Sequence, residues 1–236
     1  MSKKYELVNE DRFGFFQLRA LRSFADVNVG DLGGWVNRKS NLSHSGDCWI
    51  YGNAKVYGDA EVCDNVKVYD NAKVYGNALV SGNALVSGDA KVYGNAKVFS
   101  NAKVFSNAKV YDNTEVCDKA KVFGNAKVYG DAEVYGNAEV YDNARIYGKA
   151  EIYGDVEICD NAEVNKSSDY IVFKNSLTSG RYYTYTFSND SWKIGCFFGD
   201  TKKLKHHLKD ETNGNQRFEY GLAIDYVTKL RKHKRK

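Results

Sequence analysis

The middle of the chain, from Cys48 to Asn165, repeats one six-residue pattern of apolar and polar positions without interruption. A β-branched residue returns at every sixth position from Ile50 to Val164, and a small or apolar residue, mostly Ala, stands two positions before it. The position between them is most often Lys or Glu. Residues two apart in a strand lie on the same side of it. Each repeat unit therefore predicts one short strand with its apolar residues inward and its charged residue outward.

Each repeat unit ends in residues that favour a corner. Gly, Asp or Ser is followed by Asn, Asp or Lys, and Gly, Asn and Asp tolerate the positive φ of tight turns. One such strand cannot bury a core alone, so neighbouring units must stack as in other short-period solenoids. If three units complete a coil, residues 18 apart share a column, and this arrangement yields one uniform face and two mixed ones. We therefore predict a triangular prism with about 18 residues per coil.

The uniform face carries a column of cations beside a column of tyrosines. These columns consist of Lys55, Lys73, Lys91, Lys109, Lys127 and Arg145, and of Tyr57, Tyr75, Tyr93, Tyr111, Tyr129 and Tyr147. Like charges about 5 Å apart repel by roughly 1 kcal/mol in water, so stacked amines favour an acidic partner. Tyrosine rings can stack on bases, as in proteins that bind single-stranded nucleic acids. The alternative is a purely structural ladder held by ring packing.

The two ends of the chain do not repeat. In residues 1–45, the segments Tyr5–Val8 and Phe13–Leu21 predict strands, and Asp31–Val36 predicts a turn with an aromatic anchor. We expect this segment to be an N-terminal β cap, because the first coil would otherwise present an open sheet edge. Residues 46–165 form the predicted β-helix.

Residues 166–236 predict a small C-terminal α+β domain. Strands are expected at 169–174, 181–187 and 192–198, and helices from Asp200 to Glu211 and from Gln216 onward. The last eight residues carry six Lys or Arg. Contacts with a polyanion are possible for Arg231, Lys232, Lys234 and Arg235. The alternative is a solvated basic tail.

The six-residue pattern resembles the hexapeptide repeat of left-handed β-helix proteins, in which an aliphatic residue is followed by turn-forming positions and then a small residue. The resemblance covers about half of the chain and implies a mainly β fold built on a single-stranded left-handed parallel β-helix. A right-handed β-helix is the alternative. The segment Gly30–Gly34 is similar to one found in uncharacterised bacterial and prophage proteins of this class, which implies a phage or prophage accessory or inhibitor protein.

The same repeat class includes acyl- and acetyltransferases, which resemble one another in a catalytic His at a subunit interface, often near a loop that interrupts the coil. The coils predicted here contain no His and no inserted loop. The four histidines are His44, His206, His207 and His233. Five Cys without a CxxC motif or a Cys/His cluster argue against structural zinc. We expect no catalytic, cofactor-binding or metal-binding residues.

The formal net charge of +4 is unevenly distributed, because the basic tail follows a repeat block with excess Asp and Glu. No apolar run reaches the length of a membrane span, and the cysteine pattern is typical of a reducing cytosol. We expect a cytoplasmic, non-catalytic β-helical scaffold that binds another macromolecule, and the first expected partner is a protein. A homo-oligomer is also possible. The alternatives are an acyl- or acetyltransferase and a protein that binds nucleic acid through the Lys/Tyr face and the tail.

Overall fold

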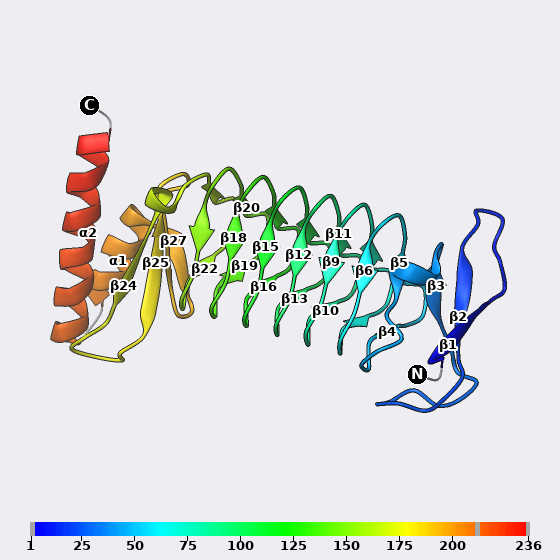
Figure 1. The fold of residues 1–236 in the computed structure, drawn as a ribbon. Helices are drawn as coiled ribbons and strands as arrows, with labels where there is room; N and C mark the ends of the chain where they lie inside the picture. The colour runs from blue at the N-terminus through cyan, green and yellow to red at the C-terminus, as the bar shows by residue number, and fades with distance from the viewer. Residues whose placement is uncertain (1–2, 211–212, 235–236) are drawn as a thin grey trace.

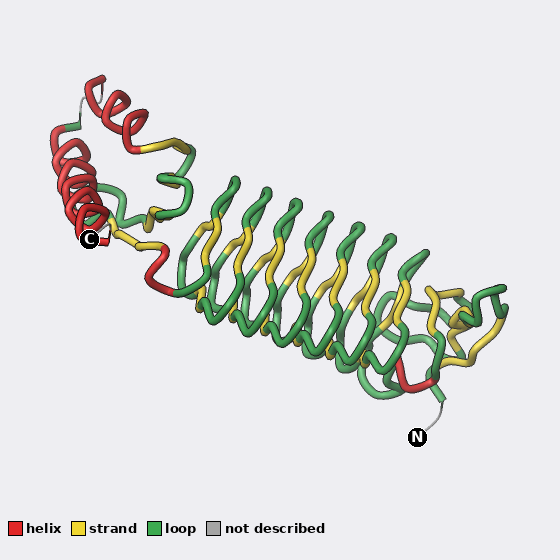
Figure 2. The backbone as a smooth tube through the Cα atoms, turned by 90° about the horizontal axis from the view of Figure 1, so that it is seen from above, coloured by secondary structure: helices red, strands yellow, loops and turns green. Residues whose placement is uncertain are grey.

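The computed structural model describes residues 3–210 and 213–234 and shows an elongated rod with a cap at one end and two helices at the other (Figure 1). The rod is a parallel β-solenoid of about seven turns, in which twenty two-residue strands form three faces. Seen from above, the strand segments line up in straight rows joined by corners (Figure 2). The three-sided section and the coil of 18 residues are confirmed, since Lys91 pairs in parallel with Lys73 and Lys109. Left-handed winding stays a prediction of the resemblance.

The strands of the rod fall into three sheets. The seven-stranded sheet comprises β4 (Trp49–Ile50), β7 (Lys67–Val68), β10 (Leu85–Val86), β13 (Lys103–Val104), β16 (Lys121–Val122), β19 (Glu139–Val140) and β22 (Glu157–Ile158). The six-stranded sheet comprises β6 (Glu61–Val62), β9 (Leu79–Val80), β12 (Lys97–Val98), β15 (Glu115–Val116), β18 (Glu133–Val134) and β21 (Glu151–Ile152). The third face comprises β5 (Lys55–Val56), β8 (Lys73–Val74), β11 (Lys91–Val92), β14 (Lys109–Val110), β17 (Lys127–Val128), β20 (Arg145–Ile146) and β23 (Glu163–Val164), and it continues into the cap as a ten-stranded sheet.

The interior of the rod is filled by the Ala and Val columns that the repeat predicts. These side chains are buried along the whole rod, as Ala108 and Val110 show with 0% exposure. The corner residues adopt backbone angles in the left-handed region, as Asp64 does with φ +61°. The Oδ2 atom of Asp64 accepts a hydrogen bond from the Gly82 amide of the next coil at 2.8 Å. At Gly94 (φ +72°), a Cβ would lie 2.8 Å from the nitrogen of Asp112, so a side chain there would need the coils to shift locally, whereas glycine fits without strain.

The N-terminal cap is an extension of one face of the rod. Strands β1 (Tyr5–Val8), β2 (Phe16–Ala20) and β3 (Leu32–Val36) pair antiparallel, a 3-10 turn follows at Lys39–Asn41, and β3 pairs in parallel with β5. The turn predicted at Asp31–Val36 is therefore wrong, because most of this segment is a strand. Its glycines serve close packing: a Cβ at Gly33 would lie 2.7 Å from both the Ile50 carbonyl oxygen and the Trp49 ring.

The C-terminal unit is an antiparallel sheet covered by two helices. A 3-10 turn at Ser167–Asp169 leads to β24 (Tyr170–Lys174), β25 (Tyr182–Thr186), β26 (Ser191–Ile194) and β27 (Phe197–Asp200), which are followed by α1 (Thr201–Asp210) and α2 (Gly214–Lys234). The single strand predicted at 192–198 is wrong: Gly195, with φ +54°, turns the chain and divides this segment between two strands. Glu211, the expected end of the first helix, lies outside the described residues.

The buried residues of the described chain form two clusters. One runs from the cap through the rod to Tyr170, and the other lies between the C-terminal sheet and its helices, around Tyr185, Trp192 and Leu204. The last helix, predicted from Gln216 onward, buries Tyr220, Ala223, Ile224 and Val227. Neither described helix is long and apolar enough to cross a membrane.

Candidate functional site

The structure brings the two predicted columns of the uniform face together. The Cα atoms of its basic residues pair from coil to coil in the order Lys55, Lys73, Lys91, Lys109, Lys127 and Arg145. Each tyrosine lies two residues after its basic neighbour, at the edge of the same face. The columns exist because a unit of constant length returns to the same face every third strand.

The tyrosine column is a continuous stack of parallel rings. From Tyr57 to Tyr147, successive ring centroids are 4.8–5.3 Å apart and the ring planes differ by 1–10°. The face of each inner ring is thus covered by its neighbours, and Phe15 packs edge-on against Tyr57 with centroids 5.4 Å apart. Partial burial raises the pKa of Tyr93 to about 12, so its hydroxyl stays neutral at physiological pH. Along most of its length the column therefore offers ring edges and hydroxyl groups, while bases need free ring faces for stacking.

Among the described residues, carboxylates pair with the basic column only at its two ends. Lys55 lies 3.6 Å from the Asp11 carboxylate and over the Phe15 ring, and Arg145 lies 3.1 Å from Glu163. The four residues between them have no carboxylate within 4 Å in the described part of the chain. We call these four the lysine row: Lys73, Lys91, Lys109 and Lys127.

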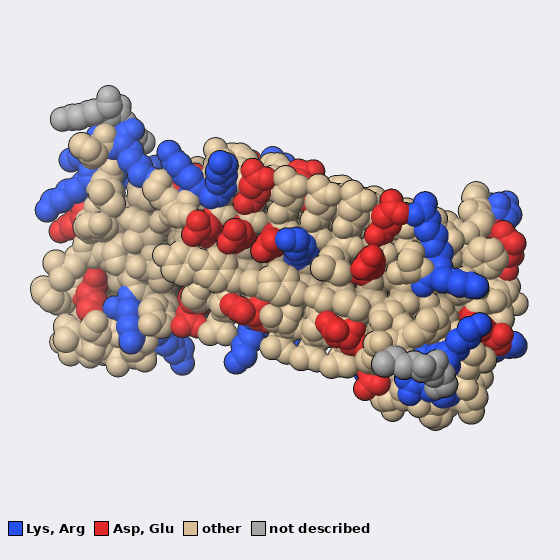
Figure 3. Space-filling view, in the orientation of Figure 1, with Lys and Arg blue, Asp and Glu red and all other residues tan. Residues whose placement is uncertain are grey.

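The other two faces balance more of their charge between coils. Lys97 pairs with Glu115 at 2.8 Å on the six-stranded face, and Lys121 pairs with Glu139 at 2.7 Å on the seven-stranded face. Figure 3 views the six-stranded face, where the blue side chain in the middle of the rod is followed by red ones toward the C-terminal end. These ion pairs form because, in each of these two columns, a Lys on one coil is followed by a Glu on the next coil. The lysine row, which does not change sign, keeps its positive charge.

The predicted basic tail is partly folded back onto the C-terminal unit. Arg231 forms an ion pair with Asp190 and donates a hydrogen bond to the Tyr185 hydroxyl at 3.0 Å. Lys234 lies over the Phe187 ring, 3.9 Å from its centroid, and bonds the carbonyl of Ser168. Lys232 is exposed, and Arg235 lies outside the described residues. Two of the four tail residues thus already have partners within the fold, and their role in binding stays a prediction.

The histidines do not form a shared site. His44 stacks on Tyr5 with ring centroids 4.3 Å apart, and burial together with nearby Lys4 lowers the pKa of its imidazole. His206 and His207 lie on α1 and His233 near the end of α2, at the far end of the rod from His44 (Figure 1). In the described ranges, no group of three or more His, Cys, Asp or Glu could hold a metal ion.

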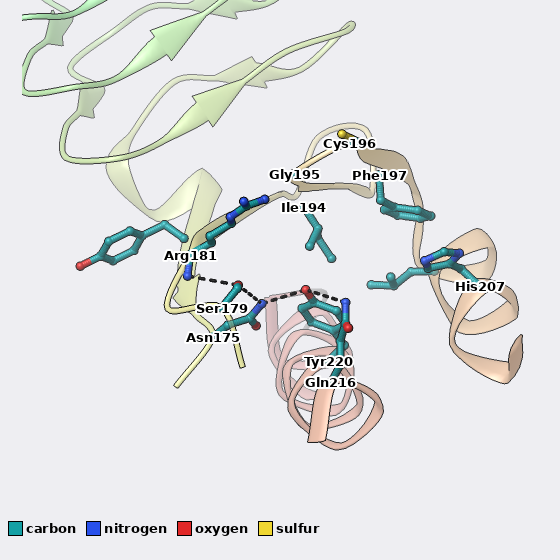
Figure 4. Close-up of a pocket in the computed structure, with 12 residues that line it drawn as sticks. Asn175, Ser179, Arg181, Ile194, Gly195, Cys196, Phe197, His207, Gln216 and Tyr220 are labelled. Carbon is teal, nitrogen blue, oxygen red and sulfur yellow. Dashed lines mark hydrogen bonds between the residues drawn. The ribbon is translucent and has the colours of Figure 1, made fainter. Parts of the chain in front are cut away.

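A cavity in the C-terminal unit is absent from the sequence-based predictions. It has a volume of about 520 Å³ and lies between the segment after β24, the β26–β27 turn and both helices (Figure 4). Its lining includes Arg181, Cys196 and His207. His207 is visible in the sequence, but no spacing rule links residues that come from four separate elements.

Comparison with known proteins supports the repeat. The family model described as "YdcK Beta solenoid repeat" matches residues 72–94, which lie within the rod. The "Uncharacterized acetyltransferase YdcK" of Escherichia coli (strain K12) is 34% identical over 61 residues, which cover 21% of this chain and 19% of that protein. The chain thus aligns with about a fifth of the length of this relative. These similarities and the fold confirm a β-solenoid like that of hexapeptide-repeat proteins.

Proposed function

We propose that this protein is a non-catalytic β-solenoid scaffold that binds an acidic surface of another protein through the lysine row. The proposal is carried by one observation: four successive coils present an amine on the same face without a carboxylate partner in the described residues. Uncompensated like charges in a row destabilise the fold. Such a row gains favourable interactions when a negative surface lies against it.

The geometry of the row favours a protein over a nucleic acid. Adjacent rings on this face are 4.8 Å apart, which gives the spacing of the coils. Neighbouring strands of a β-sheet are also about 4.7–4.9 Å apart, so carboxylates on successive strands of a partner can match the row. The phosphates of one DNA strand wind around the duplex axis while they advance about 3.4 Å per nucleotide, so they do not follow a straight row of amines. Base stacking, which could compensate for this mismatch, lacks free tyrosine faces along the inner column.

The first experiment neutralises the row and compares it with a matched set. One variant changes all four residues of the lysine row to Gln; the control changes Lys67, Lys97, Lys103 and Lys121 to Gln. The probe is fluorescent poly-L-glutamate, with single-stranded DNA of equal charge measured in parallel. We expect the row variant to lose at least about tenfold in affinity for poly-L-glutamate and the control to lose less than about threefold, because its lysines lie on other faces and three of them have acidic partners.

The outcomes separate the possible partners. Equal losses in the two variants would show that only net charge matters, and the proposed site would be wrong. If DNA binds more tightly than poly-L-glutamate and depends on the row, the partner is a nucleic acid and the proposal of a protein fails. Sedimentation of the unchanged protein and of the row variant measures self-association and so tests whether the protein forms a homo-oligomer.

A transferase is the second candidate, because the relative in Escherichia coli is named an acetyltransferase. We expect no transfer or hydrolysis of acetyl-CoA, since the histidines lie apart and the described coils carry no inserted loop. Turnover of acetyl-CoA that disappears in His44→Ala or His207→Ala would favour the transferase. The five unpaired cysteines fit the proposed cytoplasmic location, and the phage or prophage origin stays a prediction.

A further inference from the structure

The cavity of the C-terminal unit is built from separate elements that meet around an apolar centre (Figure 4). Ile194 and Phe197 come from the β26–β27 hairpin, and Leu204 comes from α1. His207 stacks on the Phe197 ring with centroids 5.3 Å apart. A cavity of about 520 Å³ lies within the range of about 300–1,000 Å³ that is typical of small-molecule sites.

The lining contains a fixed positive charge and no negative one. It includes the Arg181 guanidinium, the His207 imidazole and several uncharged amide and hydroxyl groups, but no carboxylate. Arg181 has no acidic partner within 4 Å in the part of the chain that the structure describes. Its side chain extends toward the turn at Gly195, where a Cβ would lie 4.0 Å from Nη1 (Figure 4). Glu219, on the neighbouring helix, accepts hydrogen bonds from the Ser176 and Leu177 amides instead.

One wall of the cavity contains an incomplete hydrogen-bond network. Asn175 is 3% exposed, and its Nδ2 donates to the Tyr220 hydroxyl at 2.8 Å and to Ser179 Oγ at 3.3 Å. Its Oδ1 is buried and has no partner. If the amide were turned over, Nδ2 would take the unpaired position, so one amide atom stays unpaired in either orientation. Buried polar atoms without partners are uncommon. Oδ1 has almost no accessible surface, so it lies behind the cavity wall and takes no part in the ligand contacts proposed below.

We propose that this cavity binds a small organic anion, namely a carboxylate with an aromatic or branched aliphatic body. The guanidinium of Arg181 pairs with the carboxylate, because a planar fork of N–H donors matches its two oxygens. The body of the ligand fills the space beside Ile194, Phe197 and Leu204. This site is independent of the lysine row, because it uses the C-terminal unit alone.

The test uses Cys196, an exposed thiol in the lining, as a reporter in the undivided chain of 236 residues. Its alkylation by iodoacetamide is followed by mass spectrometry, with Cys63 on the rod as the internal reference. The probes are indole-3-acetate and phenylacetate at millimolar concentration, and their neutral amides are the matched controls. We expect each carboxylate to slow the alkylation of Cys196 at least about threefold, while Cys63 is unaffected and the amides have a weaker effect.

Variants assign the effect to the guanidinium. In Arg181→Gln, the carboxylate concentration needed for half-maximal protection is expected to rise at least about tenfold. In Arg181→Lys it should rise less, because a single amine keeps the charge but not the planar fork of donors. Lys209→Gln, which removes an equal charge from the exposed surface of α1, should leave the protection unchanged. Circular dichroism checks that each variant is folded. Equal protection by acids and amides, no protection at all, or full protection in Arg181→Gln would each overturn the proposal.

Discussion

Replacing Lys91 with Gln should stabilise the fold, because this amine repels its neighbours and has no acidic partner in the described residues. Its strand lies between those of Lys73 and Lys109, and the coils are spaced about 4.8 Å apart. Two unit charges at that separation interact by about 0.9 kcal/mol in water, and screening over a Debye length of about 8 Å reduces this to roughly 0.5 kcal/mol. Two neighbours therefore give an expected gain of about 1 kcal/mol in the free energy of unfolding.

The same substitution at Lys97 should have the opposite sign. Lys97 forms an ion pair with Glu115 at 2.8 Å, with side-chain exposures of 53% and 36%, and its neighbour on the preceding coil is the uncharged Leu79, so loss of the amine should lower the free energy of unfolding by about 0.5 kcal/mol. The two variants should thus differ by roughly 1.5 kcal/mol.

Urea is the suitable denaturant, because guanidinium would screen the charges. Unfolding is followed by far-UV circular dichroism at about 0.15 M NaCl, where the Debye length is about 8 Å, and again at about 1 M NaCl, where it falls to about 3 Å. We expect the difference between the two variants to shrink by more than half. A destabilising Lys91→Gln, or a difference that salt leaves unchanged, would refute the idea of an uncompensated row.

Three further predictions concern the corners, the tyrosines and the tail. Asp64→Ala loses the hydrogen bond from the Gly82 amide and keeps the positive φ, so it should lower the free energy of unfolding by about 2 kcal/mol. Asp64→Gly loses the same hydrogen bond but tolerates the positive φ, so it should lower the free energy of unfolding by about 1 kcal/mol. Equal urea midpoints for the two variants would contradict this account. The pKa of the Tyr93 phenol is raised to about 12 in the folded state, whereas it is about 10 in the unfolded chain. The free energy of unfolding should therefore fall as pH rises from about 10 to 12, and a constant value in tyrosinate-monitored titrations would count against the buried stack. Arg231→Gln should speed hydrogen exchange in α2 by removing its ion pair, while the exposed control Lys232→Gln should not; identical exchange in the two would show that the pair contributes nothing.

Most of the rod could be predicted from the sequence because its pattern is periodic. A residue such as Val110 is followed by an equivalent residue 18 positions later, and a coil of constant length places the two side by side. Sequence alone thus gave the lysine row and its tyrosines, although not their isolation from carboxylates. That property depends on whether another segment supplies an acid, as the cap does when Asp11 approaches Lys55.

The non-repeating ends were predicted less well, because their contacts are not set by any period. Gly33 looked like a turn residue, and only the position of Trp49 and Ile50 against it shows that it is needed for close packing within a strand. The sequence predicts a free cation at Arg231, whereas in the fold Asp190, 41 residues earlier, pairs with it.

The amino-acid sequence by itself determined the winding period, the filling of the interior and the face on which each charge lies, because these follow from strand alternation and a fixed repeat length. The tertiary structure alone decided which charges are compensated, where the tail docks and that a cavity lies beside Arg181. These features depend on segments distant in the chain meeting in space, and local propensities do not encode which segments meet.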